Sequence, residues 1–476
     1  MRDRFLGQGY RVFYWGQFGD SMAVPVSLMA DMIDNACRTL VVGLGKTGLS
    51  VARYLSRHQV PVAVVDSRAQ PPGLEELRKE LPADVALFLG GFEAQAFERA
   101  ERIVVSPGVS IREAPIAAAA ARGVPVIGDI ELFARVARAP VVAITGSNGK
   151  STVTTLLSAM AQQAGKVVRT GGNIGVPALD LITDSEPDLY VLELSSFQLE
   201  TTSSLRPAAA VVLNISADHM DRYPDLAAYS EAKQTVYRNA AVQVVNADDP
   251  LASALADTGR RRLRFTLGEP AAGEFGVRDH RGAQWLAHGE ERIMPVSAIR
   301  MVGHHNVVNV LAALALGDAI GLAVDAMIEA VNEFRGLPHR MQLVAEHNGI
   351  RWYNDSKGTN VGATLAAIGS AEGSVVLIAG GDAKGADLEP LAAPLQAKGR
   401  AAVLIGKDAA RLQAVLQGHV PVTQATDMAQ AVALAAGLAQ PGDSVLLSPA
   451  CASTDMFRNF EERGDVFIRA VRGQLA

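Results

Sequence analysis

Residues 144–152 of the chain read Ile144-Thr145-Gly146-Ser147-Asn148-Gly149-Lys150-Ser151-Thr152. An apolar run, 141–144, leads into this stretch, and a helix-compatible segment, 152–160, follows it. A strand, a glycine-rich turn and a helix in this order can hold phosphates, because backbone N–H groups at the helix N-terminus point toward the anion. Lys150 would reach the terminal phosphates and Ser151 would hold Mg²⁺. The stretch predicts a nucleoside triphosphate site, although Ile144 stands where the usual motif has its first glycine.

The same rhythm of apolar run, turn and helical stretch continues on both sides of this motif. One series opens at Thr39, a second at Pro140 and a third near Gly349. Parallel sheets with crossover helices have this pattern, so we expect an α/β protein with three domains. The expected domains are 37–137, 138–336 and 337–476, divided near Arg138 and at the Gly-Leu-Pro break of residues 336–338.

Length and composition limit the classes of protein that need to be considered. The 476 residues carry 44 Lys and Arg against 50 Asp and Glu, a net charge of −6, which argues against nucleic acid or an anionic membrane as partner. Two cysteines, Cys37 and Cys451, are too few for a disulfide framework or a zinc cluster. Because no apolar run of about 18 residues occurs, we expect a cytoplasmic protein without membrane insertion. Residues 1–36 have no apolar signal segment and no periodic face, and we expect them to lie outside the folded core.

A second glycine-rich turn, Gly43-Leu44-Gly45-Lys46-Thr47-Gly48, follows another apolar run, and Asp66 ends the next one. Read alone, this arrangement indicates a binding site for a dinucleotide such as NAD. The pattern is short, however, and arises easily by chance in a chain with 44 glycines. It predicts a nucleotide- or phosphate-binding turn without deciding which nucleotide. A tight turn that only packs a helix on a sheet is the other interpretation.

Polar side chains stand where several apolar runs end. Glu193 ends one such run, Asp218 and His219 lie just beyond a second, and Asp355 follows a third. The carboxyl ends of parallel strands face the ligand crevice, so these residues are candidates for a site. Each of them taken singly could instead be a cap or a solvated turn residue.

Two helical stretches carry further candidates. On spacing alone, Lys233 is best explained as a solvated helix lysine. Asn306 and Asn309 are three residues apart and therefore share a helix face, where they would either cap the helix or contact a base.

Seven segments of the chain, taken together, resemble one family. They are 144–152, 193–198, 218–223, 303–309, 338–340, 354–360 and 448–453. In this order they are similar to the Mur ligases, the ATP-dependent amide ligases of peptidoglycan precursor synthesis, over about residues 38–476. Within the family, 354–360 and 446–467 resemble the branch that adds D-glutamate.

The resemblance implies a fold and a reaction. The fold would have an N-terminal Rossmann-like domain that binds UDP, a central P-loop ATPase-like domain and a C-terminal Rossmann-like domain that binds the amino acid. ATP would convert the carboxylate of UDP-N-acetylmuramoyl-L-alanine to an acyl phosphate, which the D-glutamate amine attacks. Two Mg²⁺ ions and a carbamylated lysine would assist, in a monomer whose domains close around the substrates.

The resemblance also implies roles for individual residues. The catalytic residues would be Lys150, Glu193, His219 and Lys233. ATP would be bound by Gly146, Ser147, Asn148, Gly149, Lys150, Ser151, Thr152, Asn306, Asn309, Arg340 and Asp355. The UDP-sugar would be bound by Thr47, Asp66, Ser67, Arg68 and Asn173, and D-glutamate by Thr359, Lys384, Ser453 and Phe460. The metal ligands would be Ser151, Glu193, His219 and Lys233, the last as its carbamate.

Three alternatives remain at this point. Another Mur ligase or a folylpolyglutamate synthetase would share the ATP site, but segment 354–360 and the first glycine-rich turn speak against both. A nucleotide-gated binding protein without catalysis is opposed by the presence of Lys150, Glu193, His219 and Lys233. An NAD dehydrogenase would use the first glycine-rich turn.

Overall fold

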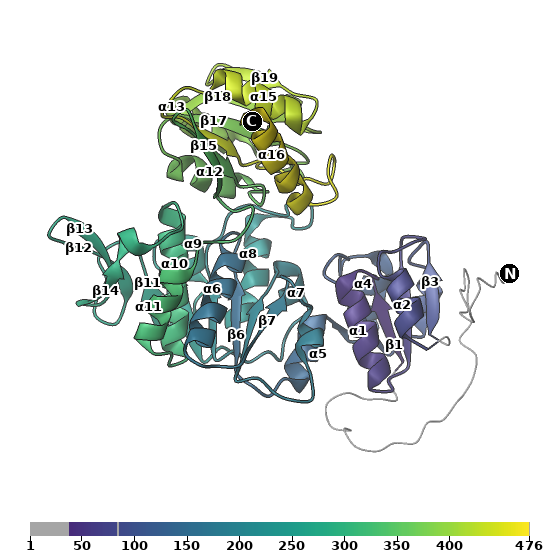
Figure 1. Ribbon diagram of the computed structural model, residues 1–476. Coiled ribbons are helices and arrows are strands. Elements are labelled where there is room, and N and C mark those ends of the chain that lie inside the picture. Colours follow the sequence, from purple (N-terminus) through teal and green to yellow (C-terminus); the bar gives the residue numbers. More distant parts are fainter. Residues whose placement is uncertain (1–37, 83–84, 476) are drawn as a thin grey trace.

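Each of the three α/β series forms its own sheet in the computed structural model, which describes residues 38–82 and 85–475 (Figure 1). The expectation of an α/β protein built on three sheets is confirmed. The expectation for residues 1–36 lies outside the described residues. We refer to the N-terminal unit (β1–β5), the central unit (α5–α11) and the C-terminal unit (β15–α16, with residues 337–341 that precede it). The exact domain boundaries near Arg138 and at 336–338 stay predictions.

The N-terminal unit is a parallel five-stranded sheet in the order β3-β2-β1-β4-β5. Its elements are β1 (Thr39–Val42), α1 (Lys46–Arg57), β2 (Val62–Asp66), α2 (Leu74–Glu80), β3 (Ala86–Leu89), α3 (Ala94–Glu98), β4 (Arg102–Val105), α4 (Ala114–Ala121) and β5 (Val126–Ile127). A Cβ on Gly48 would lie 1.8 Å from the Gly43 carbonyl oxygen, so only glycine lets α1 start this close to β1. The glycine-rich turn is therefore a close contact between helix and strand at the edge where the sheet order reverses.

The central unit contains a nine-stranded sheet in the order β14-β13-β12-β11-β10-β9-β6-β8-β7. Its strands are β6 (Val141–Thr145), β7 (Val168–Gly172), β8 (Leu189–Glu193), β9 (Ala209–Val212), β10 (Val242–Asn246), β11 (Arg261–Phe265), β12 (Phe275–His280), β13 (Ala283–His288) and β14 (Glu291–Pro295). Strands β12 to β14 form an antiparallel meander, whereas β6 to β11 are parallel. Strand β6 lies between β8 and β9. The glycine-rich stretch that follows it, residues 146–152, is called the phosphate loop below, and it starts from the middle of the parallel part of the sheet.

Helices cover this sheet on both faces (Figure 1). They are α5 (Asp129–Val136), α6 (Lys150–Gln163), η1 (Ala178–Leu181), α7 (Ser196–Glu200), α8 (Leu226–Gln234), η2 (Thr235–Tyr237), α9 (Pro250–Ala254), η3 (Val296–Ala298), α10 (His304–Ala319) and α11 (Val324–Glu333). Helix α10 is buried along most of its length, which explains its almost uninterrupted apolar sequence. No helix in the described ranges is long and apolar enough to cross a membrane.

The C-terminal unit is a six-stranded sheet in the order β15-β16-β20-β17-β18-β19. Its elements are β15 (Gln342–His347), β16 (Ile350–Asn354), α12 (Val361–Ser370), β17 (Val375–Gly380), η4 (Glu389–Leu391), α13 (Ala392–Lys398), β18 (Gly399–Ile405), α14 (Ala409–Leu416), β19 (Val422–Gln424), α15 (Met428–Leu438), β20 (Ser444–Leu447) and α16 (Phe460–Leu475). Only β15 is antiparallel to its neighbour, so the ends of β16, β17, β18 and β20 share one edge.

Candidate active site

The phosphate loop follows β6 and ends at α6, as the sequence predicts. Gly149 has a φ of 84°, and a Cβ there would lie 2.4 Å from Asn309 Oδ1, so glycine is required by both conformation and space. Lys150 Nζ donates to the carbonyl oxygens of Gly146 (2.8 Å) and Ser147 (2.9 Å). Burial lowers the pKa of Lys150, whereas Glu193 acts in the opposite direction. The loop thus carries a half-buried cation at the helix N-terminus, the arrangement that binds phosphates.

Glu193 ends β8 beside this loop and is buried, with 3% of its surface exposed. Its Oε1 accepts a hydrogen bond from Asn173 Nδ2 at 2.7 Å, but its buried Oε2 has no hydrogen-bond partner among the described residues. A buried carboxylate oxygen without a partner is unfavourable unless a cation or a donor binds it. Ser151 Oγ also belongs to the phosphate loop. It accepts from Arg340 Nη2 of the C-terminal unit at 2.6 Å.

Lys233 lies on α8 and is 1% exposed, so the interpretation as a solvated lysine is wrong. Its Nζ donates to the Gly146 carbonyl oxygen at 2.9 Å and lies 4.6 Å from the centre of the Tyr229 ring. Burial, and then the nearby Lys150, hold the pKa of Lys233 well below its usual value. The lysine is therefore a buried amine next to the phosphate loop.

His219 lies in the loop before α8, with a φ of 59°. Its ring packs edge-on against Phe197, with 4.8 Å between the ring centres, and its Nε2 is 3.8 Å from Asp218 Oδ2. Burial lowers the pKa of His219, while Asp218 partly opposes that effect. His219 and Lys233 line one cleft of about 390 Å³ together with the phosphate loop.

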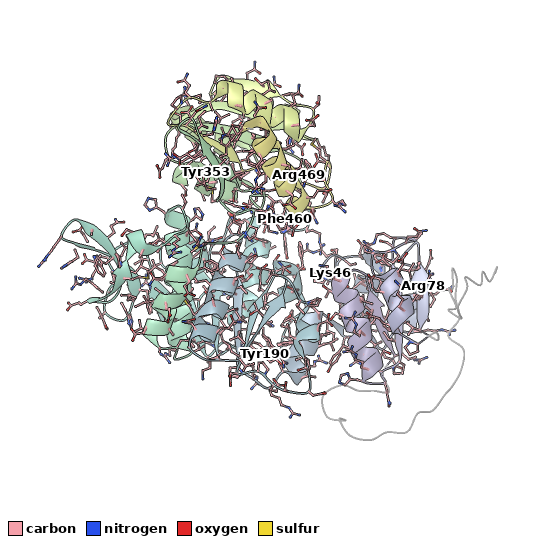
Figure 2. All side chains as sticks on the ribbon, in the orientation of Figure 1. Lys46, Arg78, Tyr190, Tyr353, Phe460 and Arg469 are labelled. Carbon is pink, nitrogen blue, oxygen red and sulfur yellow. The ribbon has the colours of Figure 1, made fainter. Side chains whose placement is uncertain are left out.

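The same cleft is lined by all four residues predicted to hold D-glutamate. They are Thr359, Lys384, Ser453 and Phe460. Phe460 opens α16 and points toward the central unit from the C-terminal unit (Figure 2). The folded chain therefore brings residues that are more than 200 positions apart to one cleft with the phosphate loop.

The residues predicted to hold adenosine line a neighbouring cleft of about 300 Å³. Asn309 Nδ2 donates to Asn306 Oδ1 at 3.2 Å, and Asn306 Nδ2 donates to the Val302 carbonyl oxygen at 2.7 Å. Arg340 and Asp355 reach this cleft from the C-terminal unit. Burial raises the pKa of Asp355 to about 6, although hydrogen bonds from Ser448 and the backbone act against it.

The residues predicted to hold the UDP-sugar line a third cleft, of about 970 Å³, which runs from the first glycine-rich turn to Ser151 and Glu193. Lys46 lies at the side of the N-terminal unit that faces the other two (Figure 2). Asp66, however, is committed to the protein itself: its Oδ2 accepts from Leu44 N at 2.7 Å and its Oδ1 from Arg68 N at 2.8 Å. Arg68 also forms an ion pair with it at 2.7 Å. Asp66 thus braces the turn, whereas Ser67 and Arg68 are exposed to the cleft.

One site residue was quoted in the sequence motif but given no role. Lys357 lines all three clefts, and so does Arg340. The Nζ of Lys357 lies 3.8 Å from the centre of the Phe460 ring, and burial lowers the pKa of Lys357 to about 8. The available signal was the position of Lys357 two residues after Asp355, just beyond the end of β16 at Asn354. The buried Tyr229, which shares a hydrogen bond of 3.2 Å with Ser147 Oγ, was missed because nothing in the sequence distinguishes it.

Comparisons with known proteins agree with this geometry. Three family descriptions match in order: "Mur ligase MurD-like, N-terminal domain" at residues 37–128, "Mur ligase middle domain" at 144–317 and "Mur ligase, glutamate ligase domain" at 339–451. The UDP-N-acetylmuramoylalanine–D-glutamate ligase of Nitrosococcus oceani is 56% identical over 443 residues, which are 93% of this chain and 98% of that protein. The chain belongs to the Mur ligase family.

Further relatives extend this result. The UDP-N-acetylmuramoylalanine–D-glutamate ligase of Marinobacter nauticus is 54% identical to this Mur ligase over 439 residues, or 92% of this chain and 98% of that protein. Among solved structures, the MurF ligase of Thermotoga maritima in complex with ADP has a TM-score of 0.60 at 16% identity, covering 93% of this chain and 99% of its own. The UDP-N-acetylmuramate–alanine ligase MurC of the same organism has a TM-score of 0.56 at 18% identity, covering 92% and 99%. The two structures show a shared fold, and the sequence relatives show the family.

Proposed function

We propose that this Mur ligase joins D-glutamate to UDP-N-acetylmuramoyl-L-alanine with conversion of ATP to ADP and phosphate, a step of peptidoglycan precursor synthesis (EC 6.3.2.9). The observation that carries the proposal is that the three clefts meet at Arg340 and Lys357, with the phosphate loop on one side. The relatives that are more than half identical over nine-tenths of the chain carry this activity in their names. We further propose that the ligase acts in the cytoplasm, as a monomer, on small-molecule substrates.

The clefts suit a reaction through an acyl phosphate. A carboxylate oxygen of the UDP-sugar attacks the γ-phosphorus, and the bond between that phosphorus and ADP breaks. The D-glutamate amine then attacks the carboxyl carbon, forms the C–N bond and gives up a proton. The C–O bond to the phosphate breaks, and phosphate leaves. Phosphoryl transfer depends on positioning and on compensation of negative charge. Lys150, Arg340 and Lys357 supply that charge from half-buried positions.

The residues present fit Mg²⁺. Within the part of the chain that the structure describes, Glu193 Oε2 is buried and has no hydrogen-bond partner, and Ser151 lines the same cleft. Among residues 38–82 and 85–475, no group of three or more His, Cys, Asp or Glu is placed to hold a metal, so the ATP phosphates would complete the coordination, as is usual for Mg²⁺. Ser151 and Glu193 would hold one ion, and His219 and a carbamate on Lys233 a second, near Asn173. Bound there, Mg²⁺ would neutralise charge on the transferred phosphoryl group.

The surroundings of Lys233 favour carbamylation. The amine must be neutral to attack CO₂, and burial with Lys150 nearby lowers the pKa of Lys233 in that direction. The product is an anion with oxygen donors, and the same Lys150 charge would then stabilise it. An ordinary ammonium at this position would instead repel Mg²⁺.

The dehydrogenase alternative loses its main support. In dinucleotide-binding folds the acidic residue after the second strand hydrogen-bonds the ribose. Here both oxygens of Asp66 accept hydrogen bonds from Leu44 and Arg68. The turn is thus better suited to the diphosphate of a UDP-sugar, with Thr47 beside it, than to the ribose of NAD.

Phosphate release tests the proposed function directly. The full-length protein is given UDP-N-acetylmuramoyl-L-alanine, ATP and Mg²⁺ with D-glutamate, L-glutamate, L-alanine or meso-diaminopimelate. We expect release of phosphate to depend on D-glutamate alone. Equal stimulation by all four amino acids would contradict the specificity, and no stimulation by any of them would contradict the ligase activity.

A further inference from the structure

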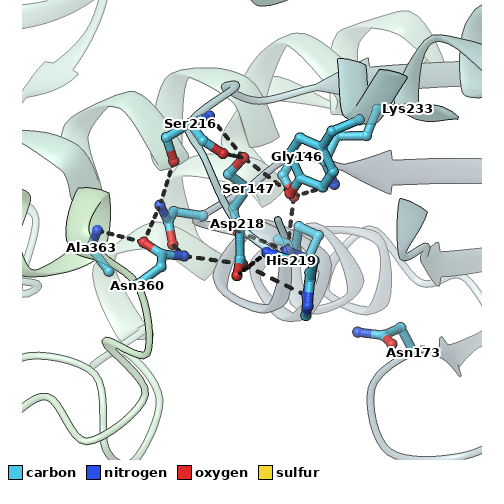
Figure 3. A network of polar contacts seen from close by, with 12 residues as sticks. Gly146, Ser147, Asn173, Ser216, Asp218, His219, Lys233, Asn360 and Ala363 are labelled. Carbon is cyan, nitrogen blue, oxygen red and sulfur yellow. Dashed lines mark hydrogen bonds and ion pairs between the residues drawn. The ribbon is translucent and has the colours of Figure 1, made fainter. Parts of the chain in front are cut away.

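The start of helix α12 is a contact between the C-terminal unit and the central unit (Figure 3). Asn360, directly before this helix, is 6% exposed. Its Nδ2 donates to Asn148 Oδ1 at 3.1 Å and to Asp218 Oδ2 at 3.2 Å, and its Oδ1 accepts from Asn148 Nδ2 at 3.3 Å. Both hydrogens of one amide are therefore used across the boundary between the two units. The Asn360 side chain therefore links Asn148 of the phosphate loop to Asp218, the residue before His219.

The central partners of Asn360 are held by their own unit. Asn148 N donates to Asn214 Oδ1 at 2.8 Å, and Asn214 Nδ2 donates back to the Asn148 carbonyl oxygen at 3.0 Å. Ser147 Oγ donates to the Ser216 carbonyl oxygen and accepts from Ser216 N, both at 2.9 Å. The amide of Asn148 is thus presented on a framework that does not need Asn360, and Asn360 docks onto it.

Gly362, in the first turn of α12, approaches the same framework. A Cβ on Gly362 would lie 2.9 Å from Ser216 Oγ and 3.4 Å from Asn148 Nδ2. A large side chain at this position would push α12 away from the phosphate loop. Gly369, near the end of the same helix, would meet nothing within 4 Å and is a natural control.

We propose that Asn360 is a positioning residue that couples docking of the C-terminal unit to the geometry of Asn148 and Asp218. Its Oδ1 also accepts from Ala363 N at 2.8 Å, so the amide that docks on the central unit also caps α12. Lys357 and Thr359 immediately precede it in the chain and line the cleft with His219. When Asn360 is docked, these two residues are held at the reacting groups. The proposal rests on the proposed function for its kinetic readout.

Two substitutions separate docking from capping. Asn360→Ser keeps an oxygen that can cap α12 and removes both donations from Nδ2. Asn360→Asp keeps the shape and the cap, but places a second carboxylate against Asp218. Because two partly buried hydrogen bonds are lost, one of them to a carboxylate, we expect kcat to fall about 10-fold or more and the KM for D-glutamate to rise. Equilibrium binding of UDP, which the N-terminal unit provides, should be unchanged.

A cap elsewhere in the same unit provides the matched control. Asp427 caps α15 by accepting from Gln430 N at 2.9 Å and lines none of the three clefts. Asp427→Ala should lower the melting temperature and leave kcat unchanged. Asn360→Ser should lower kcat and leave the melting temperature nearly unchanged. Wild-type kcat and D-glutamate KM in Asn360→Ser would overturn the proposal. So would a loss of activity in Asp427→Ala as large as that in Asn360→Ser.

A steric test approaches the same contact from the helix. Gly362→Leu and Gly369→Leu both replace a helical glycine by a strong helix former, so both should stabilise α12 similarly. Only Leu at 362 meets the central unit, and we expect a loss of turnover of about 10-fold or more for that variant alone. Equal turnover in the two variants would overturn the proposal.

A distance measurement tests docking without any catalytic readout. Spin labels at exposed Glu290→Cys of the central unit and Gln417→Cys of the C-terminal unit, with Cys37 replaced by serine, report the separation of the two units with ADP and Mg²⁺ present. We expect a narrow distribution in the parent protein and a broader or longer one in Asn360→Ser and Gly362→Leu. Identical distributions would overturn the proposal. Because this readout needs no ligation, it distinguishes failure of the docking proposal from failure of the proposed function.

Discussion

Glu193 lies among four cationic side chains, which are Lys150, Lys233, Lys357 and Arg340. Burial lowers the pKa of each of these four groups, and Glu193 acts in the opposite direction on all of them. Concentrating positive charge in a poorly solvated place costs free energy, which bound phosphates and carboxylates would offset. At the scale of single residues, the site is therefore built for anions.

Lys150→Ala should reduce D-glutamate-dependent phosphate release by on the order of 10³-fold or more, because the residue is the phosphate-loop cation. The fold should remain, since the hydrogen bonds of the side chain go to two carbonyl oxygens of its own loop, those of Gly146 and Ser147. Lys166→Ala, an exposed lysine just after the same helix, should be fully active. Near-normal phosphate release from a folded Lys150→Ala protein would contradict the assignment of this loop.

Lys233→Ala should be nearly inactive and should regain activity with acetate, because a small carboxylate can occupy the place of the carbamate. Formation of the carbamate requires the neutral amine. The lowered pKa of Lys233 means that this form is populated at a lower pH than for a solvated lysine. Activity should therefore fall in CO₂-free buffer and recover faster at higher pH when CO₂ is returned.

The direct measurement for Lys233 is ¹³C NMR after labelling with ¹³CO₂, since acid conditions in mass spectrometry remove carbamates. We expect a carbamate resonance that is absent from Lys233→Ala. An active enzyme without this resonance, together with a fully active Lys233→Ala protein, would leave Lys233 as a buried structural amine.

At the scale of elements, α5 connects the N-terminal sheet to the central unit. Gly128 N donates to the Thr201 carbonyl oxygen, and Asp129 Oδ2 accepts from Gln198 Nε2 at 3.0 Å. Gln198 in turn completes the capping box of α7 with Ser195. The other oxygen of Asp129, Oδ1, is buried and accepts no hydrogen bond from the described residues, and burial raises the pKa of this carboxyl to about 6. The connection between the two units therefore contains a carboxyl group whose charged form is disfavoured by burial.

Asp129→Asn should stabilise the protein at pH 8 and have little effect near pH 3.5. The pKa of Asp129 is raised on folding from 3.8 to about 6, so the folded state binds more protons than the unfolded state between these values. Stability from this group is present below the unfolded pKa and is lost as the pH rises through about 6. The loss is on the order of 3 kcal/mol at most. Thermal unfolding of both proteins between pH 3.5 and 8 measures it, and a difference that does not change with pH would contradict the prediction.

At the scale of the whole molecule, the two nucleotides are assigned to different units. The UDP-sugar cleft begins in the N-terminal unit, whereas the adenosine cleft lies between the central and C-terminal units. The UDP-sugar cleft and the cleft of the predicted D-glutamate residues share Ser151, Asn173 and Glu193. A substrate held in the UDP-sugar cleft would therefore approach the phosphate loop through the region where residues of all three units meet.

Asp66→Ala should raise the KM for the UDP-sugar with much less effect on the KM for ATP. The reason is local: Asp66 holds Leu44 N and the Arg68 side chain, and both would be released. Asp66→Asn, which can still accept one of these hydrogen bonds, should have a smaller effect. NADH should neither bind nor compete with the UDP-sugar, and tight NADH binding that Asp66→Ala abolishes would restore the dehydrogenase interpretation.

Much of the fold was predictable from the order of residues along the chain. Apolar runs that end in glycine-rich turns identify parallel strands followed by helices, because strand, turn and helix are local in sequence. Gly149 and Gly48 show why the turns need these residues, since a Cβ at either position would meet backbone or an amide. The membership in the Mur ligases was likewise readable from motifs, and the relatives confirm it.

The tertiary structure decided what depends on residues far apart in the chain. Lys233 looks like a surface lysine along its own helix, and only packing of α8 against the phosphate loop makes it a buried amine. Arg340 reaches Ser151, and Asn360 reaches Asn148, across separations that no local pattern encodes. Burial and pKa depend on all the residues that pack around a side chain in the folded protein. The sequence pattern therefore identifies candidate residues, but it does not show which of them become buried and contact one another.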